Sequence, residues 1–133
     1  MALNINLTSV PIEDLDRAEA FYTQKLGFVV KTNIPMGDTR LLTLVSPDNP
    51  DGAQLLLEPC GMVPEVKTFR EWLYNSGIPF AAFEVDDCQG EYELLKGNGV
   101  EFRGDPADMG TSIAATLDDT CGNLIMIYED TSG

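Results

Sequence analysis

The sequence predicts an α+β protein in which a β-α-β-β-β module occurs twice in tandem. The main observation is an internal repeat, in which IEDLDRAEAFYTQKLGF (residues 12–28) matches VDDCQGEYELLKGNGVEF (residues 85–102) in order and character. Each copy has an apolar residue, two acids, an amphipathic helical pattern, a glycine and the start of a strand. Two four-stranded sheets, each with a helix on one face, would leave their other faces free to enclose a cup. The expected fold is therefore a cup-shaped mixed sheet.

The first module is expected at about residues 4–60. Asp14 is expected to cap its helix, because apolar residues recur at helical spacing directly after it, and Gly27 ends the helix. Turn residues at 34–37 and a Pro/Asp/Asn loop at 47–52 separate the later strands. Apolar and β-branched runs predict strands at residues 5–12, from 28 onward, 40–45 and 53–58.

A linker helix is expected at about residues 64–76, with Val66, Phe69 and Leu73 as its apolar stripe and Gly77 at its end. The second module then occupies about residues 78–130. Asp87 is predicted to cap a helix whose apolar positions are Cys88, Tyr92 and Leu95. Strands are expected at residues 79–85, 99–102, 111–117 and 123–129.

Length and composition describe a single domain without targeting segments. A chain of 133 residues can bury a core without disulfides. It has no run of eighteen apolar residues and no basic segment followed by an apolar one, so we expect a cytoplasmic protein with no membrane partner. The three widely spaced cysteines favour reduced thiols over a disulfide framework. The net charge of −14 argues against a nucleic-acid partner and favours cationic small molecules.

The chain contains no histidine. This excludes Ser-His-Asp and Cys-His catalysis, and it removes the commonest ligand of zinc, nickel and non-haem iron. Any bound metal would have to depend on carboxylates, thiols and backbone oxygens.

Two strings, VPIEDLDRAEAFYTQKLGF and DDTCGNLI, resemble the vicinal oxygen chelate superfamily, which includes glyoxalases, bleomycin-resistance proteins and extradiol dioxygenases. The strings Phe-x-Val-Asp-Asp and Asp-x-x-Gly-Asn occupy the expected places in the second module. The resemblance covers essentially the whole chain. It implies paired β-α-β-β-β modules in a glyoxalase-like fold, a cup-shaped pocket and usually a homodimer.

The resemblance also implies where a metal would be held. Metal-dependent relatives draw four ligands from four strands, a His or Gln, a Glu, a His and a Glu. The corresponding positions here are all apolar, namely Leu7, Leu56, Phe80 and Met126. Among neighbouring polar residues, strand alternation turns Asn6, Thr8 and Glu129 to the opposite face and leaves only Glu58 beside Leu56. We therefore expect neither a metal nor another cofactor.

The same alternation predicts the lining of the cup, which is mostly apolar with a few polar groups, as in small-molecule sites. The expected ligand-binding residues are Leu7, Ser9, Arg40, Leu56, Glu58, Phe80, Ala82, Glu84, Met126 and Tyr128. The two glutamates favour a cationic ligand. Core packing is the alternative for the apolar members, solvent exposure for the glutamates, and pairing with an acid across the sheet for Arg40. Phe69 and Trp72 are interpreted as helix-face packing.

Three functions follow from this lining. The favoured one is a metal-independent protein that sequesters an amphipathic or cationic small molecule. One alternative is a lyase, isomerase or dioxygenase with a non-standard site, in which Tyr128, Arg40 or backbone donors stabilise an enediolate and Glu58 or Glu84 is the base. The other is a dimeric interaction module whose cup is filled by side chains.

Overall fold

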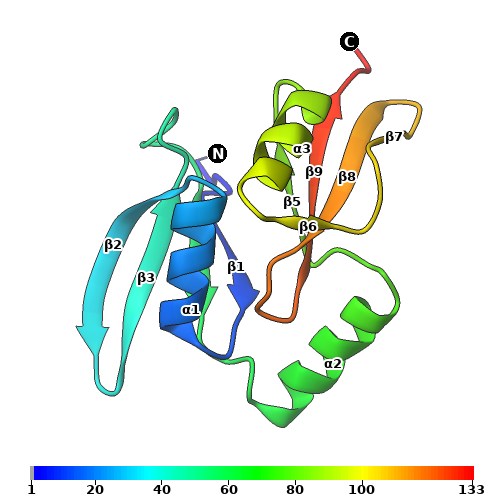
Figure 1. Cartoon of the computed structure of the whole chain (residues 1–133). Helices are drawn as coiled ribbons and strands as arrows, with labels where there is room; N and C mark the ends of the chain where they lie inside the picture. Colours follow the sequence, from blue (N-terminus) through cyan, green and yellow to red (C-terminus); the bar gives the residue numbers. More distant parts are fainter. Residues whose placement is uncertain (1) are drawn as a thin grey trace. The chain divides into compact units, whose positions relative to one another are not determined.

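The computed structural model describes residues 2–133 and divides into two compact units, the first ending at Lys67 and the second spanning Thr68–Gly133 (Figure 1). The two units share one topology. Their sheets have the orders β1-β4-β3-β2 and β5-β9-β8-β6, with β7 pairing with β8. In each unit the first strand pairs in parallel with the last, and the other pairs are antiparallel. The predicted duplication is therefore confirmed.

The first unit contains β1 (Leu7–Pro11), α1 (Leu15–Ala20), a π-helical turn η1 (Phe21–Lys25), β2 (Val29–Met36), β3 (Thr39–Val45) and β4 (Gln54–Glu58). Asp14 caps α1 as predicted, since its Oδ1 accepts a 3.1 Å hydrogen bond from the Arg17 amide. The Thr23 hydroxyl donates to the Glu19 carbonyl at 2.7 Å. This side-chain bond accompanies the widening of α1 into η1.

The turn predicted at residues 34–37 is wrong for most of its length. β2 continues to Met36, because Ile34, Pro35 and Met36 pair with the beginning of β3. Proline is tolerated there since β2 is an edge strand, where a backbone N–H is not needed on the outer side. The chain reverses after Met36, where Gly37 adopts a φ of +61°.

The second unit begins within α2 (Pro64–Asn75). It continues with β5 (Ala81–Glu84), α3 (Cys88–Gly97), β6 (Glu101–Phe102), β7 (Ala107–Asp108), β8 (Ser112–Asp118) and β9 (Leu124–Asp130). Asp87 caps α3 by accepting a 3.1 Å bond from the Gly90 amide. The predicted apolar positions of α3 are buried. The sequence did not predict β7, which has only two residues and therefore no alternation to detect.

The apolar stripe predicted for α2 is wrong at Phe69. This side chain is 53% exposed, whereas the buried residue of the helix is Arg70, at 5%. The inner side of α2 is thus polar, because it meets backbone carbonyl and carboxylate groups rather than the core.

In each unit the helix packs on one face of its own sheet. In the first sheet the buried row is Val10, Leu42, Leu44, Leu55 and Leu57. In the second it is Ala115, Leu117, Ile125 and Ile127. Figure 1 shows α1 and α3 lying across their sheets. None of the helices in residues 2–133 has the length and apolar character needed to cross a bilayer.

Candidate functional site

The face of the first sheet opposite the buried row carries four of the predicted ligand-binding residues, and we call it the first open face. In the parallel β1–β4 pair, Ser9 lies beside Leu56, and Leu7 and Glu58 follow on the same face by alternation. Leu7 is 55% exposed, and Leu56 and Glu58 are half-buried. Sequence and structure therefore agree on the strand register of this group.

Two polar residues on this face, Thr43 and Gln54, were not predicted from the sequence. Thr43 of β3 lies beside Leu56, and its hydroxyl donates a 2.8 Å hydrogen bond to Oε1 of Gln54. Thr43 is buried. The alternation within β3 contained this signal, but the antiparallel register with β4 was needed to place Thr43 beside Leu56.

The second open face is the face of the second sheet away from α3. Ala82 lies beside Met126 and Glu84 beside Tyr128 in the parallel β5–β9 pair. Phe80 extends the same row, because its amide donates to the Leu124 carbonyl at 2.8 Å. Phe80, Met126 and Tyr128 are half-buried, and Ala82 and Glu84 are exposed.

β8 adds two residues to the second open face that the sequence analysis did not select. Thr116 lies beside Met126, and Ala114 lies beside Tyr128. Thr116 thus brings a hydroxyl next to the thioether of Met126. Only the antiparallel β8–β9 register shows this, since the two strands are joined by a turn whose length does not fix the pairing by itself.

Arg40 lies on the opposite side of the first sheet from Leu56. It alternates with Leu42 and Leu44, which belong to the buried row, and its Nη2 contacts Asp16 Oδ1 at 2.8 Å and Glu19 Oε1 at 2.6 Å. The hydrogen bond with Glu19 is the main reason that the pKa of Arg40 is raised. Arg40 therefore pairs with acids, as the alternative expected, but the expected position of the partner across the sheet is wrong, because both acids lie on α1.

A hollow of about 620 Å³ lies on the α1 side of the first unit. Its lining is largely acidic and includes Asp14, Asp16, Asp38 and Arg40. Because Arg40 faces away from Leu56, this hollow is separate from the first open face.

The residues present do not fit the catalytic metal of the metal-dependent relatives. The four positions implied for its ligands hold Leu7, Leu56, Phe80 and Met126, and none of these is a ligand for a catalytic divalent ion. Glu129 accepts a 3.0 Å bond from the Cys88 amide and so lies on the α3 side of β9. Across residues 2–133, no group of three or more Asp, Glu or Cys side chains is arranged to hold a metal ion.

Two of the three cysteines, Cys60 and Cys88, lack the environment of a nucleophile. All three are free thiols. Burial raises the pKa of Cys88, and nearby Glu129 and Asp87 raise it further. Burial is the main cause of the raised pKa of Cys60, and the negative charge of Glu58 raises it further. Both groups are therefore protonated at neutral pH, whereas a reactive cysteine requires a lowered pKa.

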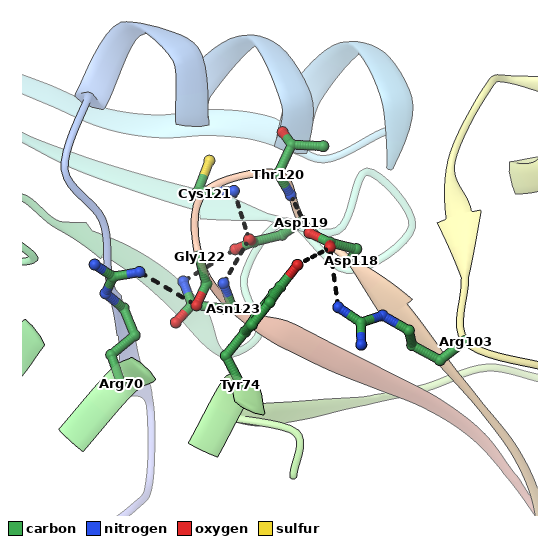
Figure 2. Close-up of polar contacts among 9 residues, drawn as sticks. All are labelled: Arg70, Tyr74, Arg103, Asp118, Asp119, Thr120, Cys121, Gly122 and Asn123. Atoms are coloured by element: carbon green, nitrogen blue, oxygen red, sulfur yellow. Dashed lines mark hydrogen bonds and ion pairs between the residues drawn. The ribbon is translucent and has the colours of Figure 1, made fainter. Parts of the chain in front are cut away.

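The turn between β8 and β9 is held by a buried carboxylate (Figure 2). Asp119 is fully buried, and its Oδ1 accepts bonds from the amides of Cys121 at 2.7 Å and Asn123 at 3.0 Å. Its Oδ2 accepts a bond from Asn123 Nδ2 at 3.1 Å. These contacts explain the Asp-x-x-Gly-Asn string. The aspartate accepts hydrogen bonds from two backbone amides of the turn, and the asparagine side chain donates a further one to the aspartate.

Residues of α2 secure this turn from outside (Figure 2). Arg70 donates to the Gly122 carbonyl at 3.3 Å, and the Tyr74 hydroxyl donates to Asp118 Oδ2. Arg103 reaches the same oxygen at 3.4 Å and lies 4.8 Å from the centre of the Tyr74 ring. Since β9 begins directly after the turn, these contacts help to position Met126 and Tyr128 on the second open face.

Two mixed sheets with the same order of four strands, to which the second adds β7, are each covered by one helix and define a duplicated α+β protein. The chain belongs to the Glyoxalase/Bleomycin resistance protein/Dioxygenase superfamily, whose model matches residues 4–127. Two similar proteins from Bacillus subtilis (strain 168) are the uncharacterized proteins YurT and YetH. YurT is 46% identical over 96% of this chain and 99% of its own. YetH is 30% identical over 97% of this chain and 100% of its own.

Solved structures show the same fold. UcmS2 is 28% identical, with a TM-score of 0.83 over 98% of this chain and 100% of its own. TnmS3, an antibiotic binding protein from Streptomyces sp. CB03234, is 23% identical, with a TM-score of 0.76 over 98% of each chain. The family resemblance expected from the sequence is therefore confirmed.

We predict that Gly122→Ala destabilises the protein more than Gly110→Ala. Both glycines have a left-handed backbone, with φ of +93° and +95°, so the backbone strain is matched. A Cβ at Gly122 would lie 1.6 Å from Arg70 Nη1, whereas a Cβ at Gly110 meets nothing within 4 Å. We expect losses in the free energy of unfolding of about 2–4 kcal/mol and about 1 kcal/mol, respectively, measured by urea denaturation.

If the contact with Arg70 causes the larger loss of stability of Gly122→Ala, an Arg70→Met background should remove it. There the additional cost of Gly122→Ala should fall to that of Gly110→Ala. Equal costs of the two glycine substitutions in the wild-type background would contradict the close contact.

We predict that Tyr74 makes the stability of the protein sensitive to alkaline pH. Its hydrogen bond to Asp118 is the main cause of its raised pKa, burial and the charge of Asp118 raise the pKa further, and Arg103 opposes the shift. A raised pKa in the folded state means that the stabilisation is fully present below the unfolded value of about 10 and is lost as pH rises through the folded value. Urea midpoints of wild type and Tyr74→Phe should therefore differ at neutral pH and converge above about pH 10. Curves that keep a constant separation up to high pH would contradict the predicted dependence of stability on Tyr74 ionisation.

Proposed function

We propose that this protein is a metal-independent binding protein that holds an amphipathic or cationic small molecule on the open faces of its sheets. The observation that carries the proposal is the replacement of the family's ligand positions by Leu7, Leu56, Phe80 and Met126. Apolar side chains at these positions provide contact area where metal-dependent relatives place charged or polar ligands.

The polar groups on these faces support the choice of ligand charge. Glu58 and Glu84 lie in the same rows as the apolar residues, and the protein carries a net charge of −14. Carboxylates beside apolar surface favour molecules that combine a cationic group with an apolar body, and the overall charge increases their encounter rate. Thr116, beside Met126, offers a further hydroxyl group for orientation.

The description of TnmS3 as an antibiotic binding protein supports the binding of small molecules as a function of this fold. Several apolar side chains of the present chain are also exposed, among them Val29, Ile34 and Met36 of the edge strand β2. This exposure supports a homodimer as the functional form. The three free thiols support a reducing compartment such as the cytoplasm.

The test of the proposal combines metal analysis with ligand binding. Untagged protein should contain far less than one equivalent of metal by plasma mass spectrometry, since a histidine tag would add ligands that the chain lacks. Planar aromatic cations such as acridine orange should raise its melting temperature and bind saturably in calorimetry, with the same Kd in EDTA. One equivalent of Ni, Zn or Fe, together with loss of binding in EDTA, would overturn the proposal in favour of a metal enzyme.

The ligand charge is tested by charge-neutral substitutions. Glu58→Gln and Glu84→Gln should each weaken binding of the cation by about 3- to 10-fold, because each removes one attractive charge at nearly constant shape. Glu93→Gln is the matched control, since Glu93 is exposed on α3, which covers the other face of the second sheet. Equal effects of all three substitutions would show that only the overall charge matters.

A further inference from the structure

We propose that Phe69 and Trp72 of α2 extend the second open face into an aromatic subsite, which holds the planar ring of a ligand whose cationic group is bound at Glu84. The inference rests on the proposed function and adds to it a subsite, a ligand class and a spacing.

The surface of α2 suits a binding role better than a packing role. Phe69 and Trp72 are 53% and 58% exposed, and at three residues apart they lie on the same side of the helix. Arg70 and Tyr74 form the opposing side, which contacts the β8–β9 turn. The helix therefore attaches to its unit through polar contacts and presents two neighbouring aromatic rings to solvent, an arrangement typical of contact surfaces.

Phe69 connects this aromatic surface to the second open face. Its ring meets the ring of Phe80 edge to face, with centroids 6.2 Å apart and an interplanar angle of 70°. Phe80 directly precedes β5 and is two residues before Ala82, so strand alternation extended by one residue places it in line with the row of Ala82 and Glu84. The row of the sheet and the aromatic side of the helix thus form one continuous apolar surface.

The row along β5 gives the ligand a direction. Phe80, Ala82 and Glu84 follow each other along the chain, so the backbone of Phe80, which adjoins the aromatic subsite, is at most about 13 Å from that of Glu84 at a strand rise of about 3.3 Å per residue. Ala82 between them is small, and the flexible Met126 lies beside it. This arrangement fits an elongated molecule with a planar ring at one end and an ammonium group at the other.

A small cation is a better occupant of this surface than a second copy of the chain. A second copy carries the same net charge of −14, so bringing it against Glu84 opposes like charges. A cationic aromatic molecule is attracted by the same charges and gains stacking contacts with Phe69 and Trp72.

The first experiment measures the spacing. Naphthalenes carrying a terminal ammonium group on alkyl chains of about two to ten carbons are titrated into the untagged protein by calorimetry. Affinity should pass through a maximum when the distance from ring to nitrogen approaches about 10–13 Å. Affinity that rises steadily with every added methylene, as expected for unspecific apolar contact, would overturn the subsite.

The second experiment uses variants on exposed positions. Phe69→Ala and Trp72→Ala should each weaken binding of the best compound by about 5- to 10-fold, and Phe69→Leu should restore only part of it, because it keeps apolar area without the ring. Leu94→Ala is the matched control, since Leu94 is also exposed on a helix, at 59%, but on α3. It should leave Kd unchanged.

The outcomes separate this inference from the proposed function. Metal-independent binding that persists unchanged in Phe69→Ala and Trp72→Ala would overturn the aromatic subsite and leave the proposed function standing. Failure of the wild-type protein to bind any cationic aromatic would overturn both. A shift in sedimentation of these variants toward a smaller species, with Kd unchanged, would assign the aromatic surface to contact between copies instead.

Discussion

The structure depends on one constraint, the in-register parallel pairing of the first and last strand of each unit. Ser9 beside Leu56 and Ala82 beside Met126 fix which side chains face the helix and which face outward. A shift by one residue would exchange the two faces and expose the buried rows that end in Leu57 and Ile127. The burial of these rows therefore determines the composition of both open faces.

The second unit contains a turn between β8 and β9 that is held by side-chain hydrogen bonds. A turn closed by the buried Asp119 is secured by the end of α2, where Arg70 and Tyr74 supply polar contacts. Because the inner side of α2 is occupied by Arg70 and Tyr74, its other two aromatic residues, Phe69 and Trp72, are exposed. The same contacts that help to position β9 thus create the exposed surface of Phe69 and Trp72.

The family positions for metal ligands illustrate how one fold separates scaffold from chemistry. The strands that would carry these ligands are present in the expected register, but the side chains at Leu7, Leu56 and Met126 are apolar. The scaffold is retained because its stability depends on the buried rows. The open rows are under no such constraint, and their side chains are free to differ between an enzyme and a binding protein.

The sequence by itself determined the duplicated modules, the caps at Asp14 and Asp87 and which residues alternate together along β1, β4 and β9, because period, capping and alternation are local properties of the chain. Tertiary structure alone decided the positions of Arg40 and Phe69. Arg40 lies under Asp16 and Glu19 of α1, and Phe69 lies outside because Arg70 is drawn to the β8–β9 turn. Both placements depend on partners distant in sequence, which the local pattern does not contain.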